Sequence, residues 1–243
     1  MNLIKLSAIA STNDYLKEMI SKISVDDETV VWTNSQTSGR GQRGTSWYAE
    51  PGKSLAFSLL KRHTGLGVEA AVLVNLAVSL AVARALDSLE IPSITVKWPN
   101  DIMSDNKKIA GILIENQLQG DSIASSVIGI GINVNNRSFE NLPHAGSLHL
   151  ATGNTFDHEV VLKAVNKAVL KELRVISSRT FETLSSKYGN RLFRKGEISE
   201  FLRQDGSKFR GEILGVNSSG NLLVKMENGN SVNFRLKEIE LLY

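Results

Sequence analysis

One long apolar segment limits what this chain can fold into. Residues Ala70 to Ala83 are almost all apolar, and the surrounding stretch Val68 to Leu89 is predicted to form one helix that is apolar nearly all round. The apolar part is shorter than the roughly 20 residues that a membrane span needs. It also contains Asn75 and Ser79. We therefore expect a buried helix that other elements cover.

Short β-rich runs are available to cover it. Ile109 to Glu115 and Ser126 to Val134 are separated by the turn-forming Gln119-Gly120-Asp121, which predicts a hairpin. An α/β (α+β) domain is predicted, with helices packed on a mixed β-sheet. Further strands are expected at Thr29 to Trp32, Ser54 to Leu60 and Ile94 to Val96, and helices at Ser11 to Ile23 and Asp157 to Tyr188.

The pattern of the sequence changes after Gly189. Short alternating runs follow one another, separated by turn signals such as Asp205-Gly206 and Asn228-Gly229. We therefore expect two domains, an α/β domain at residues 1–188 and a small β-barrel at residues 189–243. The four runs are Glu197 to Leu202, Phe209 to Leu214, Leu222 to Met226 and Ser231 to Arg235.

Composition excludes several classes of site and protein. The chain has no cysteine, so disulfides and thiolate metal sites are excluded, and this absence fits a reducing cytoplasm. The formal net charge of +3 is too small to predict nucleic-acid binding on its own. Residues Met1 to Ala10 lack the charged and then apolar pattern of a signal peptide. The expected location is the cytoplasm.

A glycine-rich loop gives the first chemical signal. The stretch Gly39 to Gly44 reads Gly-Arg-Gly-Gln-Arg-Gly, and its glycines let the backbone turn tightly and bring N–H groups against a ligand. Its two arginines supply forked donors for carboxylate or phosphate. The stretch matches neither the phosphate loop of nucleoside triphosphatases nor a dinucleotide fingerprint. Taken alone, it also fits a mobile basic surface loop.

Two further motifs place polar side chains at strand ends. Lys97 to Asp101 reads Lys-Trp-Pro-Asn-Asp, and Lys108 then opens the next strand with Gly111 three positions on. Gly129 to Asn133 places two glycines and an asparagine in an apolar strand. Glycine inside a strand often marks close approach of a ligand or another backbone, and an asparagine amide suits the edge of a base. Taken separately, the first motif also fits a charged turn between two strands, and the second also fits a β-bulge.

Together these motifs closely resemble those of the biotin protein ligase family. The resemblance runs from Ser11 to Asn133 in the family's order, and more weakly through the C-terminal strands. It implies a catalytic fold like that of class II aminoacyl-tRNA synthetases, followed by an SH3-like β-barrel. It also implies an ATP-dependent ligase that forms biotinyl-5′-AMP from biotin and ATP and then transfers biotin to a lysine of a biotin carboxyl carrier protein. Because this chain begins almost at the ligase domain, the monofunctional type without an N-terminal DNA-binding domain is expected.

The resemblance implies where biotin binds. Polar side chains would hold the ureido ring, because a buried urea needs donors and acceptors on both sides. Ile112 and Leu113 would help to form apolar walls for the bicyclic body. Simple helix capping is the alternative role of Ser11 and Thr12. The implied biotin-binding residues are Ser11, Thr12, Asn13, Gln36, Gly39, Arg40, Lys108 and Gly111.

The implied catalytic residues are Arg40, Lys108 and Asp101. Arg40 and Lys108 match the charged pair at the biotin carboxylate and the α-phosphate of ATP, two groups that repel each other unless cations lie between them. Asp101 would hold the acceptor lysine and take up its proton. A role in orienting Lys108 is the alternative for Asp101, and the resemblance leaves both open.

ATP is expected to bind beside these residues. Trp47 matches the tryptophan that packs against adenine, and Asn133 matches the residue that hydrogen-bonds the base. Arg43 is expected to contact phosphate, and Asn100 lies where the acceptor lysine must arrive and completes the nucleotide-binding set. Mg²⁺ is expected with ATP, bound mainly through phosphates and waters rather than by a metal site of the protein.

The resemblance also bears on partners. A biotin carboxyl carrier protein is the expected acceptor, no DNA or membrane binding is expected, and a homodimer is left open. Gln42 and Thr45 stand where family members often carry basic residues, which leaves open how tightly the adenylate is retained.

Three other functions compete with this interpretation. Lipoate ligases share the fold and the acyl-adenylate chemistry, but they are expected to carry another motif in place of Lys-Trp-Pro-Asn-Asp. A basic module that binds nucleotide or RNA predicts a clustered basic stripe with exposed aromatic residues, whereas aromatic residues make up only 6% of this chain. A catalytically inactive scaffold is disfavoured by the intact Arg40, Lys108 and Asp101.

Overall fold

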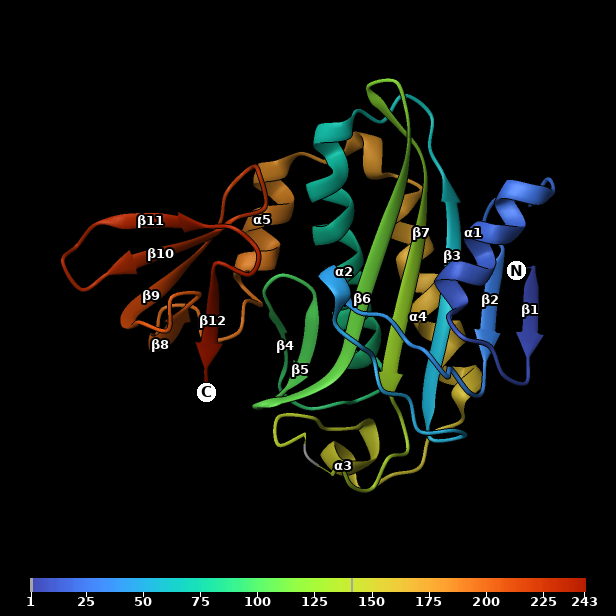
Figure 1. Cartoon of the computed structure of the whole chain (residues 1–243), viewed down its shortest axis with the longest axis horizontal. Helices are drawn as coiled ribbons and strands as arrows, with labels where there is room; N and C mark the ends of the chain where they lie inside the picture. Colours follow the sequence, from blue (N-terminus) through green and yellow to red (C-terminus); the bar gives the residue numbers. More distant parts are fainter. Residues whose placement is uncertain (1, 141) are drawn as a thin grey trace.

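The computed structural model describes residues 2–140 and 142–243, apart from the side chain of Arg43. Its larger sheet has seven strands in the order β1-β2-β3-β7-β6-β5-β4 (Figure 1). β1 and β2 pair in parallel and the other neighbours pair antiparallel, so the predicted mixed sheet is confirmed. The strands are β1 (Leu3–Leu6), β2 (Val30–Thr33), β3 (Ser54–Arg62), β4 (Ile94–Lys97), β5 (Asp101–Ser104), β6 (Lys107–Gln119) and β7 (Ser122–Asn133).

The predicted hairpin is the centre of this sheet. β6 and β7 pair over almost their whole length, from Ala110 opposite Ile132 to Gln119 opposite Ser122. Gly120 forms the turn between them with a positive φ of 57°, a conformation that glycine adopts without steric cost. The two long paired strands therefore provide an extended surface on each face of the sheet, against which other elements can pack.

Helices cover both faces of the sheet. α2 and α4 pack together on one face, and α1 lies on the other (Figure 1). The alternation of side chains along β3 separates these layers, because Phe57 and Leu59 belong to the core under α2 whereas Leu60 packs under α1. The described helices are α1 (Thr12–Lys22), α2 (Ala71–Asp87), α3 (Leu148–Thr152), α4 (His158–Leu173) and α5 (Phe181–Gly189), with short 3₁₀ turns η1 (Gln42–Gly44), η2 (Val68–Ala70) and η3 (Ile176–Ser178).

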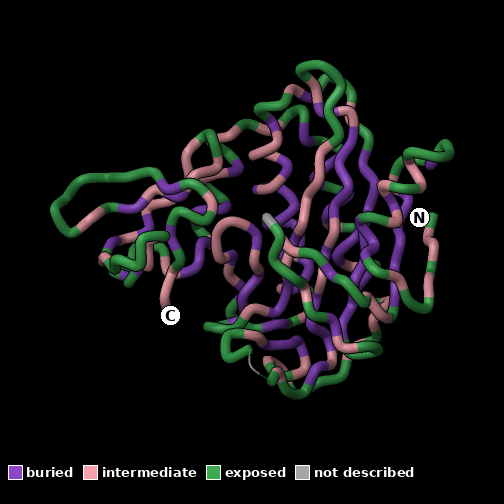
Figure 2. Tube along the Cα trace, viewed as in Figure 1, coloured by how far each residue is buried: buried purple, intermediate pink, exposed green. Residues whose placement is uncertain are grey.

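The long apolar segment is the central helix of the core, as predicted. By length and composition Val68–Asp87 is apolar enough to cross a membrane, but 61% of its apolar 18-residue window is buried inside the protein. It packs against α4, α5 and β4. Figure 2 shows the buried residues concentrated in α2 and the middle strands, with exposed residues mainly in the loops.

The C-terminal strands form a second, smaller antiparallel sheet in the order β11-β10-β9-β8-β12. All four predicted strands are present, and β12 is an addition that the sequence pattern did not show. Pairing among the described strands does not join β11 to β12, so no closed barrel is seen, and the division at residue 188 stays a prediction. The strands are β8 (Ile198–Arg203), β9 (Lys208–Val216), β10 (Leu222–Met226), β11 (Ser231–Phe234) and β12 (Ile239–Leu242).

Candidate active site

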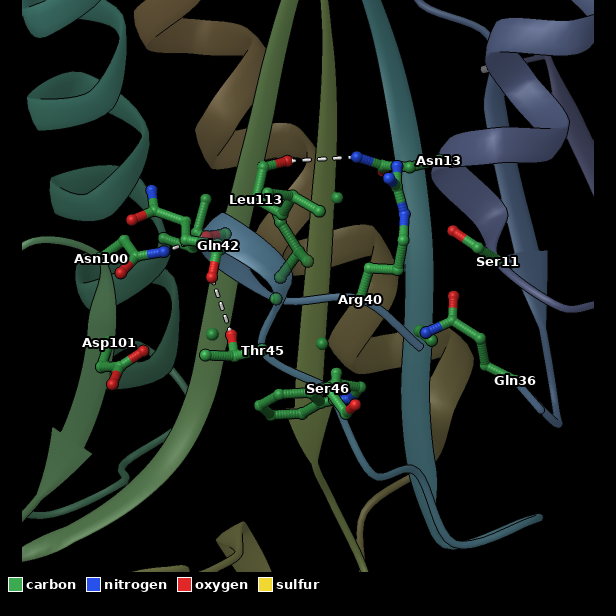
Figure 3. A pocket seen from close by; sticks show the side chains of 18 of the residues that line it. Ser11, Asn13, Gln36, Arg40, Gln42, Thr45, Ser46, Asn100, Asp101 and Leu113 are labelled. Atoms are coloured by element: carbon green, nitrogen blue, oxygen red, sulfur yellow. Dashed lines mark hydrogen bonds between the residues drawn. The ribbon is translucent and has the colours of Figure 1, made fainter. Parts of the chain in front are cut away.

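A cavity of about 300 Å³ lies on the face of the large sheet that carries α1. Strands β6 and β7 form its floor, while the N-terminus of α1, the loop over residues 36–47 and the turn before β5 form its walls (Figure 3). The structure therefore brings most of the predicted site residues into one pocket. Those that line it are Ser11, Thr12, Asn13, Gln36, Arg40, Trp47, Asn100, Asp101, Lys108 and Gly111.

The N-terminus of α1 presents hydrogen-bonding groups to this pocket. Ser11 caps the helix, because its Oγ accepts from the Asp14 backbone N–H at 3.3 Å. Thr12 donates its backbone N–H and its hydroxyl to Gln36 Oε1, at 3.0 and 3.2 Å. These two bonds fix the orientation of the Gln36 amide. Among the described residues no acceptor is recorded for Gln36 Nε2, which leaves that group as a donor for a ligand.

Ser58 is a site residue that the sequence did not reveal. It is fully buried on β3, and its Oγ lies 2.7 Å from Thr12 Oγ1 and 2.5 Å from Asn13 Oδ1. Asn13 is held at its other end by Leu113 O, 3.4 Å from its Nδ2. The available signal was a polar residue inside the apolar run Ser54 to Leu60. One hydroxyl therefore fixes two of the predicted ligand-binding side chains.

Glu115, a second unpredicted residue, gathers cations at one end of the pocket. Its carboxylate accepts from Asn13 Nδ2 at 2.8 Å, Lys17 Nζ at 2.7 Å and Arg40 NH2 at 3.0 Å. Burial acts to raise the pKa of Glu115, but the bonds from Lys17 and Asn13 outweigh it and hold this pKa below its usual value. Glu115 is therefore charged, and Arg40 also pairs with Asp14 at 2.7 Å.

Lys108 pairs with a different carboxylate on another side of the pocket. Lys108 Nζ lies 2.7 Å from Asp101 Oδ1 and 5.5 Å from the centre of the Trp47 ring. The structure therefore places Arg40 and Lys108 in one pocket, but each forms ion pairs with different carboxylates. In Figure 3 the Arg40 side chain extends toward Asn13, away from Asp101.

Trp47 lies against the glycines of the floor. A Cβ added to Gly131 would be 2.4 Å from Trp47 Cε2, and one added to Gly111 would be 3.1 Å from Trp47 Cζ3. Gly129 meets Asn13 in the same way, at 2.4 Å from its Oδ1. These strand glycines therefore permit a close approach, but side chains of the protein make it, whereas a ligand or another backbone was expected.

A second cavity, of about 950 Å³, shares Arg40, Trp47, Asp101 and Lys108 with the first. Asn133 also lines it. The Asn133 Nδ2 donates to Gly146 O at 2.9 Å, whereas its Oδ1 is buried and has no hydrogen-bond partner among the described residues. A buried acceptor without a donor is costly to leave unpaired. The Trp47 ring forms one wall of this cavity, and Asn133 Oδ1 is an unpaired acceptor. Together they suit a flat heterocycle that carries N–H groups. Gly39, from the predicted biotin set, lines this second cavity.

Asn100 has a supporting role in the structure. Asn100 lines the first cavity, but its Nδ2 donates to Ile112 O, and its backbone O accepts from Ile112 N at 3.2 Å. These bonds hold the turn before β5 to β6, so Asn100 supports the floor of the site. The side chain of Arg43, which was predicted to contact phosphate, lies outside the described residues.

Comparison with known proteins identifies the family. The biotin/lipoate A/B protein ligase family matches residues 6–133. The bifunctional ligase/repressor BirA of Bacillus subtilis is 28% identical over 233 residues, covering 94% of this chain and 70% of that protein. The biotin–[acetyl-CoA-carboxylase] ligase of Paracoccus denitrificans is 28% identical, covering 83% of this chain and 86% of that protein.

Solved structures agree with the sequence comparisons. The biotin protein ligase from Aquifex aeolicus in complex with biotin and ATP superposes with a TM-score of 0.80 at 30% identity, covering 99% of this chain and 98% of that one. The similarity therefore extends over both sheets and beyond the matched residues 6–133. The chain belongs to the biotin/lipoate A/B protein ligase family and groups with its biotin protein ligases.

Proposed function

We propose that this protein is an ATP-dependent biotin protein ligase, which forms biotinyl-5′-AMP and then transfers biotin to a lysine of a biotin carboxyl carrier protein. The observation that carries the proposal is the pair of cavities that share Trp47, Lys108 and Asp101. Two substrates bound side by side would place their reacting groups at this boundary. The relatives support both substrates, because the Aquifex aeolicus structure is a complex with biotin and ATP.

The smaller cavity suits biotin. Its volume of about 300 Å³ is at the lower end of the range for small-molecule sites. Gln36 Nε2 and the Ser11 hydroxyl supply hydrogen-bonding groups for the ureido ring, and Ile112 and Leu113 line the wall beside them. The carboxylate of biotin would then extend along β6 toward Lys108.

The first half-reaction joins biotin to AMP. A carboxylate oxygen of biotin attacks the α-phosphorus of ATP, the bond from that phosphorus to the bridging oxygen breaks, and pyrophosphate leaves with the electron pair. Lys108 would hold the attacking carboxylate against phosphate repulsion. Arg40 can join it only after leaving Glu115 and Asp14, so substrate anions must compete with two carboxylates for this guanidinium.

The second half-reaction consumes the mixed anhydride. The neutral amine of the acceptor lysine attacks the biotinyl carbonyl carbon, the bond to the phosphate oxygen breaks, and AMP leaves. Asp101 borders both cavities and would take up the proton of the amine. Its 2.7 Å contact with Lys108 equally supports the orienting role, and we propose that Asp101 serves both half-reactions.

We further propose cytoplasmic action on a biotin carboxyl carrier domain, without DNA as a partner, and a homodimer as a possible assembly. Mg²⁺ would enter with the phosphates of ATP, which with water usually supply most of its ligands. No group of three or more histidine or acidic side chains that would suit a metal gathers among the residues described, so no step is assigned to a metal bound by the protein.

The direct test is incubation of the protein with biotin, ATP, Mg²⁺ and a carboxyl carrier domain, followed by intact mass of the carrier. We expect a gain of one biotinyl group that requires ATP. A gain with lipoate and a lipoyl domain, but none with biotin, would assign the chain to lipoate ligation. No transfer of either acid would contradict a ligase.

Replacing Ser58 with alanine should weaken biotin binding by about tenfold, the cost of leaving buried hydrogen-bonding groups unpaired. Thr12 and Asn13 would lose their common partner, while the reacting groups near Lys108 would be unchanged. Calorimetric titration with biotin alone measures the effect.

Ser54→Ala is the matched control for Ser58→Ala. Ser54 is also buried on β3, but its hydroxyl bonds with Asn136 and the Glu50 backbone N–H, and neither of these partners lines the pocket. Equal losses of biotin affinity in the two variants would show that the effect reflects damage to the strand and not to the site.

A further inference from the structure

Lys97 is the one residue of the Lys-Trp-Pro-Asn-Asp motif that holds a charge but has no role so far. It is the last residue of β4 and lies directly opposite Asp101 in the β4–β5 pairing. It lines the 950 Å³ cavity together with Lys108, Asn133 and Tyr243. The same side chain borders a cleft of about 650 Å³ between the large sheet and the C-terminal sheet.

The ammonium group of Lys97 has a weak partner. Its Nζ donates to Tyr243 Oη at 3.4 Å and lies 4.4 Å from the centre of that ring. Within residues 2–140 and 142–243 no carboxylate lies within ion-pair distance of Lys97, whereas Lys108 and Arg40 both have such partners. Of these three cations, Lys97 is the one that can take an anion without first breaking an ion pair.

The surroundings of Lys97 disfavour the charged form of its side chain unless an anion lies nearby. Burial lowers the pKa of Lys97, and the charge of Lys108 acts in the same direction, while Asp101 and Glu240 act to raise it. A partly dehydrated ammonium gains more from an anionic partner than one in water does. A phosphate group in the cavity would supply that partner.

We infer that Lys97 binds the β- and γ-phosphates of the nucleotide and receives the pyrophosphate leaving group. This inference rests on the proposed function, because it places ATP in the cavity that Trp47 and Asn133 line. Lys108, eleven residues after Lys97 and across the β5–β6 pairing, would hold the carboxylate and the α-phosphate. The two lysines thereby lie on either side of the bond that breaks.

The charge balance of the step shows why a cation is needed there. Biotin carboxylate and ATP together carry the same charge as biotinyl-AMP and pyrophosphate, but the negative charge moves to the bridging oxygen of the leaving group as the bond to the α-phosphorus breaks. A fixed ammonium at that oxygen is a stronger partner in the transition state than in the bound substrate. The transfer to lysine, by contrast, releases AMP and involves no pyrophosphate.

The two half-reactions therefore test the inference separately. Lys97→Met should lower the rate of ATP-dependent biotinyl-AMP formation by about 10- to 100-fold, the range expected for a charged hydrogen bond. It should also raise the pyrophosphate concentration needed to drive the reverse reaction by a similar factor. Transfer of biotin from chemically prepared biotinyl-AMP to the carrier domain should stay within about twofold of the wild-type rate, because a change of that size is under 0.5 kcal/mol. Lys97→Arg should restore part of the loss.

Two further variants separate charge from architecture. Lys225→Met removes an exposed lysine of β10 outside the cavities and should leave both half-reactions unchanged. Tyr243→Phe removes the hydroxyl that Lys97 contacts and should cost less than Lys97→Met. Equal losses in Tyr243→Phe and Lys97→Met, or equal losses in both half-reactions of Lys97→Met, would overturn the inference. If the wild-type protein forms no biotinyl-AMP, the proposed function itself fails.

Discussion

Replacing Lys108 with methionine should reduce the rate of biotinyl-AMP formation by about 10²- to 10³-fold, the loss that follows when one charge-stabilising donor is removed from an active site. Lys108 borders both cavities, and its ammonium lies 2.7 Å from Asp101 Oδ1 and 5.5 Å from the centre of the Trp47 ring. Methionine retains most of the length and apolar surface of the side chain. The loss would therefore report on the charge alone.

Folding should hardly change in this variant. The side chains of Lys108 and Asp101 are 35% and 21% exposed, and partly exposed ion pairs contribute about 0–1 kcal/mol to the free energy of unfolding. The measurements are the rate of pyrophosphate release in a single turnover and the temperature of thermal unfolding. A rate loss without a stability loss is the expected combination.

The neighbouring lysine gives a matched control. Lys107 lies on the same strand, is exposed and lines neither cavity, and its Nζ donates to the backbone O of Pro143 at the edge of the larger cavity. Lys107→Met should therefore react at the wild-type rate. If Lys107→Met and Lys108→Met lose the same activity, the overall charge of this edge, rather than a positioned ammonium, drives adenylation.

The sequence pattern predicted the long elements, and the elements that it missed are all short. The central helix and the β6–β7 hairpin extend over many residues, so their hydrophobic pattern repeats often enough to be read. β1, β5 and β12 have four residues each and show no more than two periods of alternation. β5 also begins directly after the turn at Pro99, where the polar Asn100 and Asp101 suggest a loop.

The site residues that belong to sequence motifs could be predicted. Arg40, Trp47, Lys108 and the strand glycines could be recognised because their motifs together resemble those of one family, and the structure places them around one pocket. The partners of these residues could not be recognised. Glu115 meets Arg40 across 75 positions and Tyr243 meets Lys97 across 146, and no local pattern encodes such distant contacts.

A methyl group added at Gly131 should cost the enzyme about 10²-fold in adenylation efficiency, since a displacement of about 1 Å in a catalytic site is enough for such a loss. The new Cβ would be 2.4 Å from Trp47 Cε2 and 2.6 Å from Trp47 Nε1, too close for any real contact. Trp47 is carried by a loop and not by a strand, so its indole can lift away. The adenine position that we propose beside it would then be lost.

Gly111→Ala supplies the comparison for Gly131→Ala. Its Cβ would lie 3.1 Å from Trp47 Cζ3, so a shift of a few tenths of an ångström accommodates it. A loss of no more than about tenfold is expected, because the loop that carries Trp47 shares an overpacking strain of about 1–3 kcal/mol. The Trp47→Ala background completes the test. If Gly131→Ala acts by displacing the indole, it should have little further effect once the indole is absent, as expected for two changes that remove one interaction. A full additional loss in that background would mean that Gly131 contacts a substrate directly, and the role assigned to Trp47 would have to be given up.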